Sequence, residues 1–222
     1  MTYSCVMTTR RATRPRGRPS LDAGPVLRRD DLLAAAARHF AQGYAATSVR
    51  AIARELDVSQ AAVQHHAATK DALFAAVIDE VIVPRLVQAR NLAASMADTS
   101  VDATGQVTAL VRSRMDALVA HGGLVVGVMS DTSPGAGHRR ELLLAAIAPE
   151  RQAALRALSG LAERGVTRPV SATVWSVLSI AAIPAIAQAW PMLERLDPAL
   201  VVDRAAVLDE IADLLVRGLL PR

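Results

Sequence analysis

The chain contains few cysteines, aromatic residues and lysines, and these shortages narrow the structures it can form. Cys5 is the single cysteine among 222 residues, so an intrachain disulfide framework and a multi-cysteine metal site are both excluded. Aromatic residues make up 3% of the chain, whereas 52% is hydrophobic and consists mainly of Ala, Leu and Val. This composition predicts an all-helical protein with an aliphatic core. The length allows either one large domain or a small domain followed by a larger one.

Acidic residues are absent from residues 1–20, which carry five arginines. We expect residues 1–27 to form a flexible basic arm, because they are polar, aperiodic and rich in Arg, Pro and Thr. The segment Pro15–Pro19 reads Pro-Arg-Gly-Arg-Pro and resembles the core of an AT-hook. In such a segment Arg16 and Arg18 would lie along a narrow A·T-rich minor groove of DNA. The alternative is a solubilising tail.

No part of the sequence predicts a signal peptide or a membrane span. The first residues lack an apolar core, and the most apolar stretch, residues 174–190, is interrupted by serine, proline and glutamine. We therefore expect a soluble, cytoplasmic protein.

Residue patterns for catalysis, metals or cofactors are also weak. His65 and His66 are adjacent, so on a helix they point in different directions and cannot share a metal ion. The segment Gly135-Ala136-Gly137 follows no predicted strand, which argues against a nucleotide-binding loop. We predict that the protein is not an enzyme and needs no cofactor or metal.

Apolar periodicity predicts helices along the rest of the chain. They are expected over about residues 31–42, 48–56, 59–66, 70–97, 105–121, 124–130, 139–164, 171–190 and 204–219. Pro84 should kink the helix over 70–97, and Gly122-Gly123 should separate the helices over 105–121 and 124–130. The expected helix caps are Asp30 or Asp31, Thr47 or Ser48, Ser59 and Thr69.

Residues 47–73 contain the pattern of a helix-turn-helix, in which two short helices cross at a tight turn. Ala53 is small enough to let the second helix approach, and Val63 can fill the angle between the helices. Asp57 falls at the turn, which needs a left-handed backbone that aspartate tolerates better than most residues. Since this motif places one helix in the major groove of DNA, the pattern predicts function as well as fold.

From Asp31 to Leu73 the chain resembles the N-terminal DNA-binding domain of the TetR family of bacterial transcriptional regulators. The resemblance implies an all-α fold, with a three-helix helix-turn-helix domain over 28–75 and a larger effector-binding and dimerisation domain over 76–222. Gln64 stands where the family usually has Tyr, and Ala67 where it usually has Phe. The matching residues are Leu33, Ala36, Phe40, Gly43, Tyr44, Thr47, Ser48, Val49, Ile52, Ala53, Val58, Ser59, His66, Lys70 and Leu73.

The exposed face of the predicted recognition helix, residues 59–66, is expected to read DNA. Glutamine can bond bidentately to adenine, and histidine can donate to guanine or phosphate. Helix N-termini and basic side chains favour phosphate, and the only lysine of the chain falls where the resemblance implies a phosphate contact. For each residue the alternative is a solvated helix face. The predicted DNA contacts of the folded domain are Thr47, Arg50, Ser59, Gln60, Ala61, Gln64, His65 and Lys70.

The apolar residues of the larger domain allow two interpretations. They form either a plain aliphatic core or a core that encloses a ligand pocket. Methionine and tryptophan adapt to irregular ligands. The candidates to line a pocket for a small apolar or amphipathic effector are therefore Met115, Met129, Trp175 and Met192. The resemblance also implies a homodimer in which the last two helices pair with their symmetry mates. The predicted interface residues are Ala182, Ala185, Ala189, Ile211 and Leu215.

Together these features predict a DNA-binding transcriptional regulator. The form we expect is a repressor that binds a near-palindromic operator as a dimer and is released by its effector. One alternative is an architectural DNA-binding protein that acts through its arm without a ligand. Another is a helical ligand-binding protein whose DNA specificity has decayed, which Gln64 and Ala67 bring into consideration.

Overall fold

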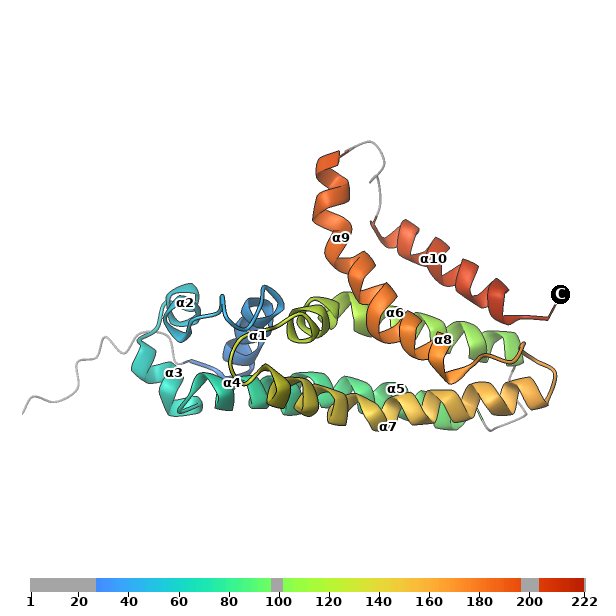
Figure 1. The fold of residues 1–222 in the computed structure, drawn as a ribbon, viewed down its shortest axis with the longest axis horizontal. Helices are drawn as coiled ribbons and strands as arrows, with labels where there is room; N and C mark the ends of the chain where they lie inside the picture. The colour runs from blue at the N-terminus through green and yellow to red at the C-terminus, as the bar shows by residue number, and fades with distance from the viewer. Residues whose placement is uncertain (1–26, 97–101, 197–203, 222) are drawn as a thin grey trace, which may run out of the picture.

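The computed structural model describes residues 27–96, 102–196 and 204–221, and these ranges contain helices, turns and loops but no strand (Figure 1). Nearly all of the expected basic arm, with Arg16 and Arg18, lies outside them. No helix within them combines the length and apolarity needed to cross a membrane. The elements are α1 (Arg29–Ala41), α2 (Val49–Glu55), α3 (Gln60–His66), α4 (Lys70–Val77), η1 (Ile78–Ile82), α5 (Val83–Ser95), α6 (Ala103–Met129), α7 (Ala136–Glu163), α8 (Ala172–Val177), η2 (Leu178–Ala182), α9 (Ile183–Leu196) and α10 (Arg204–Leu219).

The helices form two groups joined by long elements. Helices α1 to α4 lie at one end of the molecule, and the long helices α5 and α7 run side by side away from them (Figure 1). Helix α6 packs against α1 near one end, and α9 and α10 pack on it from the other side. An all-helical fold with a small N-terminal group of helices is therefore confirmed.

Three of the first four helices are capped by the residues that the sequence predicts. The side-chain oxygens of Ser48, Ser59 and Thr69 each accept a hydrogen bond from the backbone N–H three residues further on. The expected cap of α1 is wrong, because this helix begins at Arg29. Asp30 and Asp31 instead lie in its first turn, where a negative charge favours the helix dipole.

Helix α6 is continuous through Gly122-Gly123, so the expected break at these glycines is wrong. A Cβ atom on Gly123 would lie 3.1 Å from the Cβ of Ala41, and a Cβ atom on Gly127 would lie 3.1 Å from the backbone oxygen of Phe40. Phe40 and Ala41 form the C-terminal turn of α1. Two of the α6 glycines therefore let this helix approach α1 almost backbone to backbone, which a larger residue would prevent.

Two π-helical turns interrupt the α-helical hydrogen-bonding pattern, η1 between α4 and α5 and η2 between α8 and α9. Each ends two residues before a proline, Pro84 in one case and Pro184 in the other. A proline cannot donate a backbone hydrogen bond and crowds the preceding turn of an α-helix, so a wider turn accommodates it. At Pro84, where we expected a kink, the helix widens and continues.

Two hydrophobic clusters hold the chain together. The first combines residues of α1 to α4 and η1 with side chains from α6 and α7, among them Leu124, Val128 and Leu143. The second lies between α5, α6, α7, α8 and α10 and includes Trp175. The first cluster extends across the predicted domain boundary at residues 75 and 76, so the N-terminal helices share their core with the larger domain.

Replacing Gly127 by leucine should destabilise the protein, because the new side chain would meet the backbone of α1. Overpacking of this kind costs about 1–3 kcal/mol, which corresponds to a fall in Tm of about 2–12 °C for a chain of this size. Thermal denaturation followed by circular dichroism measures the change. Gly160 of α7 is the matched control, since a Cβ atom there meets nothing within 4 Å. Because leucine is the better helix former, G160L should keep or raise Tm, and an equal fall for both variants would contradict the close approach.

Candidate nucleic-acid interface and effector cavity

Helices α2 and α3 meet at a tight turn with the geometry that the sequence predicts. Asp57 adopts a φ of 53°, which is the left-handed backbone expected at the turn. Val63 is fully buried and Ala53 is 3% exposed, so α3 packs closely across α2. The N–H of Val58 donates to the carbonyl oxygen of Ala53 at 3.0 Å and closes the turn. The helix-turn-helix is therefore formed as predicted.

Helix α3 turns a polar face to solvent. Gln60, Ala61, Gln64 and His65 are all exposed, as residues that reach base edges in a major groove must be. Ser59 is also exposed, although its hydroxyl oxygen already accepts the N–H of the α3 backbone at 3.1 Å. On α2, Arg50 is exposed in the first turn of its helix. The DNA contacts of these residues stay predictions.

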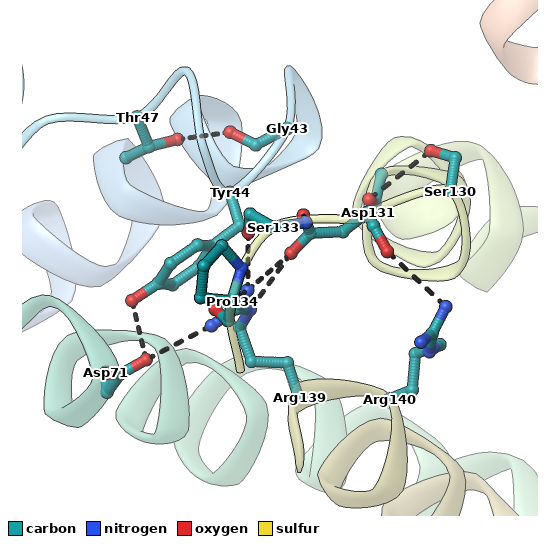
Figure 2. Close-up of polar contacts among 11 residues, drawn as sticks. Gly43, Tyr44, Thr47, Asp71, Ser130, Asp131, Ser133, Pro134, Arg139 and Arg140 are labelled. Carbon is teal, nitrogen blue, oxygen red and sulfur yellow. Dashed lines mark hydrogen bonds and ion pairs between the residues drawn. The ribbon is translucent and has the colours of Figure 1, made fainter. Parts of the chain in front are cut away.

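Thr47 lies in a different environment from the one expected of a phosphate contact. It is 4% exposed, and its hydroxyl lies 2.8 Å from the carbonyl oxygen of His39 and 2.9 Å from that of Gly43 (Figure 2). A hydroxyl that donates to these carbonyls stabilises the loop between α1 and α2. We therefore assign Thr47 a structural role and leave it out of the candidate interface.

Lys70 lies in the first turn of α4, but its ammonium group faces the loop that follows α1. Its Nζ is 4.1 Å from the centre of the Tyr44 ring, which is a cation–π contact. Partial burial lowers the pKa of Lys70 from its usual value, and the charge of Arg139 lowers it further. A phosphate contact at Lys70 therefore competes with the Tyr44 ring for the ammonium group.

Tyr44 is the centre of a polar cluster that joins the N-terminal helices to α7 (Figure 2). Its hydroxyl donates to Asp71 of α4 at 2.6 Å, and the guanidinium carbon of Arg139 lies 3.6 Å from its ring centre. Arg139 also donates to Asp131, which follows α6, at 2.7 Å. We call Tyr44, Lys70, Asp71, Asp131 and Arg139 the interdomain latch.

Burial and hydrogen bonding determine the protonation states of Tyr44 and Asp131 in the latch. Burial and the hydrogen bond to Asp71 raise the pKa of Tyr44 to about 12, so its hydroxyl keeps the proton that it donates. Burial also tends to raise the pKa of Asp131, but hydrogen bonds from Ser133 and Arg139 outweigh this effect and lower the pKa to about 2. Arg139 is 3% exposed. Within the latch, Asp131 and Arg139 therefore form a buried ion pair whose carboxylate is ionised near neutral pH.

A cavity of about 230 Å³ lies between α6, α8, η2 and α10. Of the four residues predicted to form a pocket, Trp175 lines this cavity. Met115 is buried in the surrounding cluster but is not one of the lining residues, and Met129 and Met192 are exposed. The four predicted residues therefore do not gather around one site.

Arg114 and Glu150 form an ion pair beside the cavity, with side chains that are 6% and 2% exposed. Nη1 of Arg114 donates to the Glu150 carboxylate. Burial raises the pKa of Glu150, and the neighbouring arginine partly offsets the rise. Nε of Arg114 and Nε1 of Trp175 are buried and have no acceptor within the part of the chain that the structure describes. An unpaired buried donor costs about 1–3 kcal/mol, so a bound acceptor would stabilise both nitrogens.

The sequence contained a usable signal for Arg114 and Glu150 that pattern reading missed. Arg114 follows the buried Val111 by three residues, and Glu150 follows the buried Ile147 by three residues. Each charge therefore stands on an apolar helical stripe, where it needs a buried partner. Arg139 carried the same kind of signal, because it lies between the buried Ala136 and Leu143 on one face of its helix, but nothing in the sequence identified Tyr44 as a partner.

The segment from α8 through η2 to α9 carries exposed small and apolar residues at intervals of three, four or seven positions. Ala185, a predicted interface residue, is one of them, whereas Ala182 and Ala189 are half-buried. On α10, Ile211 and Leu215 pack partly against the chain's own core, and Leu214 is the exposed apolar side chain. We define the α8–α9 stripe as Val174, Val177, Ala181, Ala185, Met192 and Leu196.

A helix-turn-helix with an exposed polar second helix, at the start of the described helical ranges, has the geometry of a DNA-binding domain. Residues 32–77 match the family described as bacterial regulatory proteins, tetR family. The match covers α1 to α4 almost completely, including the exposed face of α3. The chain therefore carries a TetR-family DNA-binding domain.

Solved structures share the fold over most of the chain. The ketosteroid transcriptional regulator KstR2 of Mycobacterium tuberculosis has a TM-score of 0.63 at 19% identity, covering 91% of this chain and 100% of that one. The TetR family transcriptional regulator PfmR from Thermus thermophilus has a TM-score of 0.60 at 22% identity, covering 86% and 99%. A regulatory protein in the tetR family from Rhodococcus has a TM-score of 0.57 at 18% identity, covering 87% and 97%. No curated protein matches this chain. The structural likeness extends the TetR fold beyond the DNA-binding domain.

Asp131→Asn should weaken the latch and remove part of the protein's acid sensitivity. Because the pKa of Asp131 is lower in the folded than in the unfolded chain, its carboxylate stabilises the fold above about pH 4, and this contribution is lost as the pH falls toward 2. At pH 7 the variant should lose about 2–3 kcal/mol, since Arg139 keeps a buried charge without its nearest carboxylate.

Urea denaturation between pH 7 and pH 3 measures this change in the free energy of unfolding. The difference in the free energy of unfolding between the wild type and D131N should become smaller toward pH 3. The exposed Asp79 provides the control, and D79N should change stability little at any pH. A gap that stays constant over this range would show that Asp131 does not act through its charge.

Proposed function

We propose that the protein is a dimeric bacterial repressor that binds a near-palindromic operator and releases it when a small apolar or amphipathic molecule enters the larger domain. The observation that best supports the DNA-reading step is the exposed polar face of α3, held across α2 inside the segment that matches the tetR family. Gln60, Gln64 and His65 on this face have the hydrogen-bonding groups that base recognition requires. Arg50 and Lys70 supply positive charge at its edges.

The release step is supported by the position of the cavities relative to the π-helical turns. The 230 Å³ cavity is lined by η2, and a second cavity of about 40 Å³ is lined by both η2 and Ile82 of η1. η1 continues directly from α4, whose first turns carry Lys70 and Asp71 of the latch. A ligand that shifts η2 and η1 would therefore change the orientation of α4.

Such a shift would act on DNA binding through the spacing of the dimer. The two recognition helices must enter successive major grooves about 34–36 Å apart. A displacement of a few ångströms at α4 misaligns one of them, and the operator is released by a shift in the population of the two states.

Gln64→Ala and Arg50→Ala should weaken DNA binding in different ways. If Gln64 reads a base edge, Q64A should lose about 1–3 kcal/mol on the operator and little on a scrambled duplex. If Arg50 holds a phosphate, R50A should weaken binding to both duplexes and lower the salt slope by about one. Fluorescence anisotropy on the duplex upstream of the gene, at several salt concentrations, measures both effects. Arg90 is exposed on α5, so R90A is the matched control and should leave binding unchanged.

The same measurement on the wild type separates the proposed function from its alternatives. A preference of about a thousandfold for one duplex supports operator reading. Equal, salt-sensitive binding to both duplexes, abolished by deleting residues 1–20, supports the arm-driven architectural protein. Absence of binding to either duplex supports a ligand-binding protein that has lost its DNA specificity.

The homodimer is supported by the α8–α9 stripe, because soluble proteins seldom leave a large apolar surface uncovered. Pairing of this stripe and Leu214 with a second copy would form a four-helix bundle. Val177 is 56% exposed and does not line the larger cavity, so V177E should place a charge in the interface without filling that cavity.

Light scattering at micromolar concentration tests this interface. The wild type should have the mass of a dimer and V177E that of a monomer. Leu144 on α7 is 41% exposed and lies off the stripe, so L144E is the control and should stay dimeric. A monomeric wild type would contradict the proposed dimer. A dimeric V177E would show that the dimer interface does not include the α8–α9 stripe.

A further inference from the structure

The 230 Å³ cavity has a wall of distinctive chemistry. Most of its lining is aliphatic, with side chains such as Val111, Leu178 and Leu219. The polar residues in this wall are Arg114, Ser179 and, through its indole N–H, Trp175. A ligand that fits here must therefore be largely apolar, and its polar group must match these three residues.

The polar groups that lack partners in this wall are hydrogen-bond donors. Nε of Arg114 and Nε1 of Trp175 can donate but cannot accept, and neither has an acceptor among the described residues. The hydroxyl of Ser179 already donates to the backbone oxygen of Trp175 at 2.6 Å. The ligand's polar group is therefore expected to be an acceptor.

The charge balance of the wall favours a neutral acceptor over an anion. The positive charge of Arg114 is paired with the carboxylate of Glu150, and both side chains are almost completely buried. A bound carboxylate would add a second negative charge to a pair that is already balanced, and a buried charge without its own partner is strongly unfavourable. A carbonyl oxygen accepts hydrogen bonds without adding charge.

The cavity volume limits the size of the ligand. A protein cavity of about 150 Å³ can hold benzene, so a cavity of about 230 Å³ has room for roughly nine non-hydrogen atoms by proportion. We propose that the cavity binds a small apolar molecule with one neutral carbonyl oxygen, such as an aryl ketone or a lactone, and that this oxygen accepts hydrogen bonds from Arg114 and Trp175.

Binding must rearrange one wall of the cavity. Neither donor nitrogen meets solvent in the unliganded protein, and Arg114 and Ser179 together separate this cavity from the 40 Å³ cavity beside η1. A ligand oxygen reaches the donors when this partition moves. This inference rests on the proposed effector role of the larger domain and names the chemistry of the effector.

Three probes of nearly the same size and shape test the proposal by calorimetric titration of the full-length protein. Acetophenone carries a neutral carbonyl oxygen, α-methylstyrene replaces that oxygen by a methylene group, and benzoate carries a charge. Acetophenone should bind roughly five- to 150-fold more tightly than α-methylstyrene, the range for two net hydrogen bonds. Benzoate should bind most weakly of the three.

Variants of the cavity wall test whether Trp175 and Arg114 cause the preference for acetophenone over α-methylstyrene. W175F removes the indole N–H but keeps an aromatic ring, so it should reduce the preference for acetophenone over α-methylstyrene. The double variant R114M/E150M removes both charges together and should reduce the same preference without leaving one charge buried alone. Trp190 does not line the cavity, so W190F is the matched control and should retain the preference.

Several results would overturn the proposal. Equal affinity for acetophenone and α-methylstyrene would show that the donors do not take part in binding, and tightest binding of benzoate would show an anion site. Failure of all three probes to bind at millimolar concentration would show that the cavity does not take molecules of this size. Release from DNA is measured separately. If acetophenone binds with the expected preference but operator affinity is unchanged, the proposed chemistry of the site is supported and the effector role is contradicted.

Discussion

The close contact between α1 and α6 is the constraint on which the rest of the structure depends. Gly123 and Gly127 let α6 reach the last turn of α1, and this brings Leu124 and Val128 into the same hydrophobic cluster as Phe40. A helix-turn-helix of this size has little surface to bury alone, because small domains form marginal cores. The shared cluster therefore stabilises the DNA-binding helices and at the same time fixes how they are oriented on the larger domain.

The interdomain latch adds a polar connection beside this apolar contact. An apolar core tolerates small movements poorly. A buried ion pair is also sensitive to movement, because it is favourable only in a geometry that pairs both charges. Arg139 contacts the Tyr44 ring and pairs with Asp131, and Lys70 lies over the same ring. Lys70 is also the predicted phosphate contact, so the same ammonium group would serve both DNA binding and the contact between the domains. If Lys70 binds phosphate as predicted, the ammonium group has to leave the Tyr44 ring, and DNA binding would then be coupled to opening of the latch.

The sequence predicted local features well and distant pairings poorly. The caps Ser48, Ser59 and Thr69, the left-handed Asp57 and the buried Val63 all depend on residues a few positions apart, and all were confirmed. The break at Gly122-Gly123 was wrong because the reason for small residues there is Ala41 and its neighbours, some eighty positions earlier. The latch and the cavity wall escaped prediction for the same reason, since Tyr44 meets Arg139 and Arg114 meets Glu150 only after folding. The exposure of residues on α3 depends on no distant partner, so the pattern could predict it.

The two π-helical turns offer a structural route for the proposed effect of the cavity on DNA binding. A π-helical turn holds one extra residue, so converting it to α-helix rotates everything beyond it about the helix axis. η1 stands between α4, which carries the latch residues Lys70 and Asp71, and α5, and its Ile82 faces the small cavity that Arg114 and Ser179 close. η2 contributes Ser179 to both cavities. In the proposed mechanism, a ligand that moves Arg114 and Ser179 would shift both turns, and a rotation at η1 would be transmitted along α4 to Lys70, which lies over the Tyr44 ring.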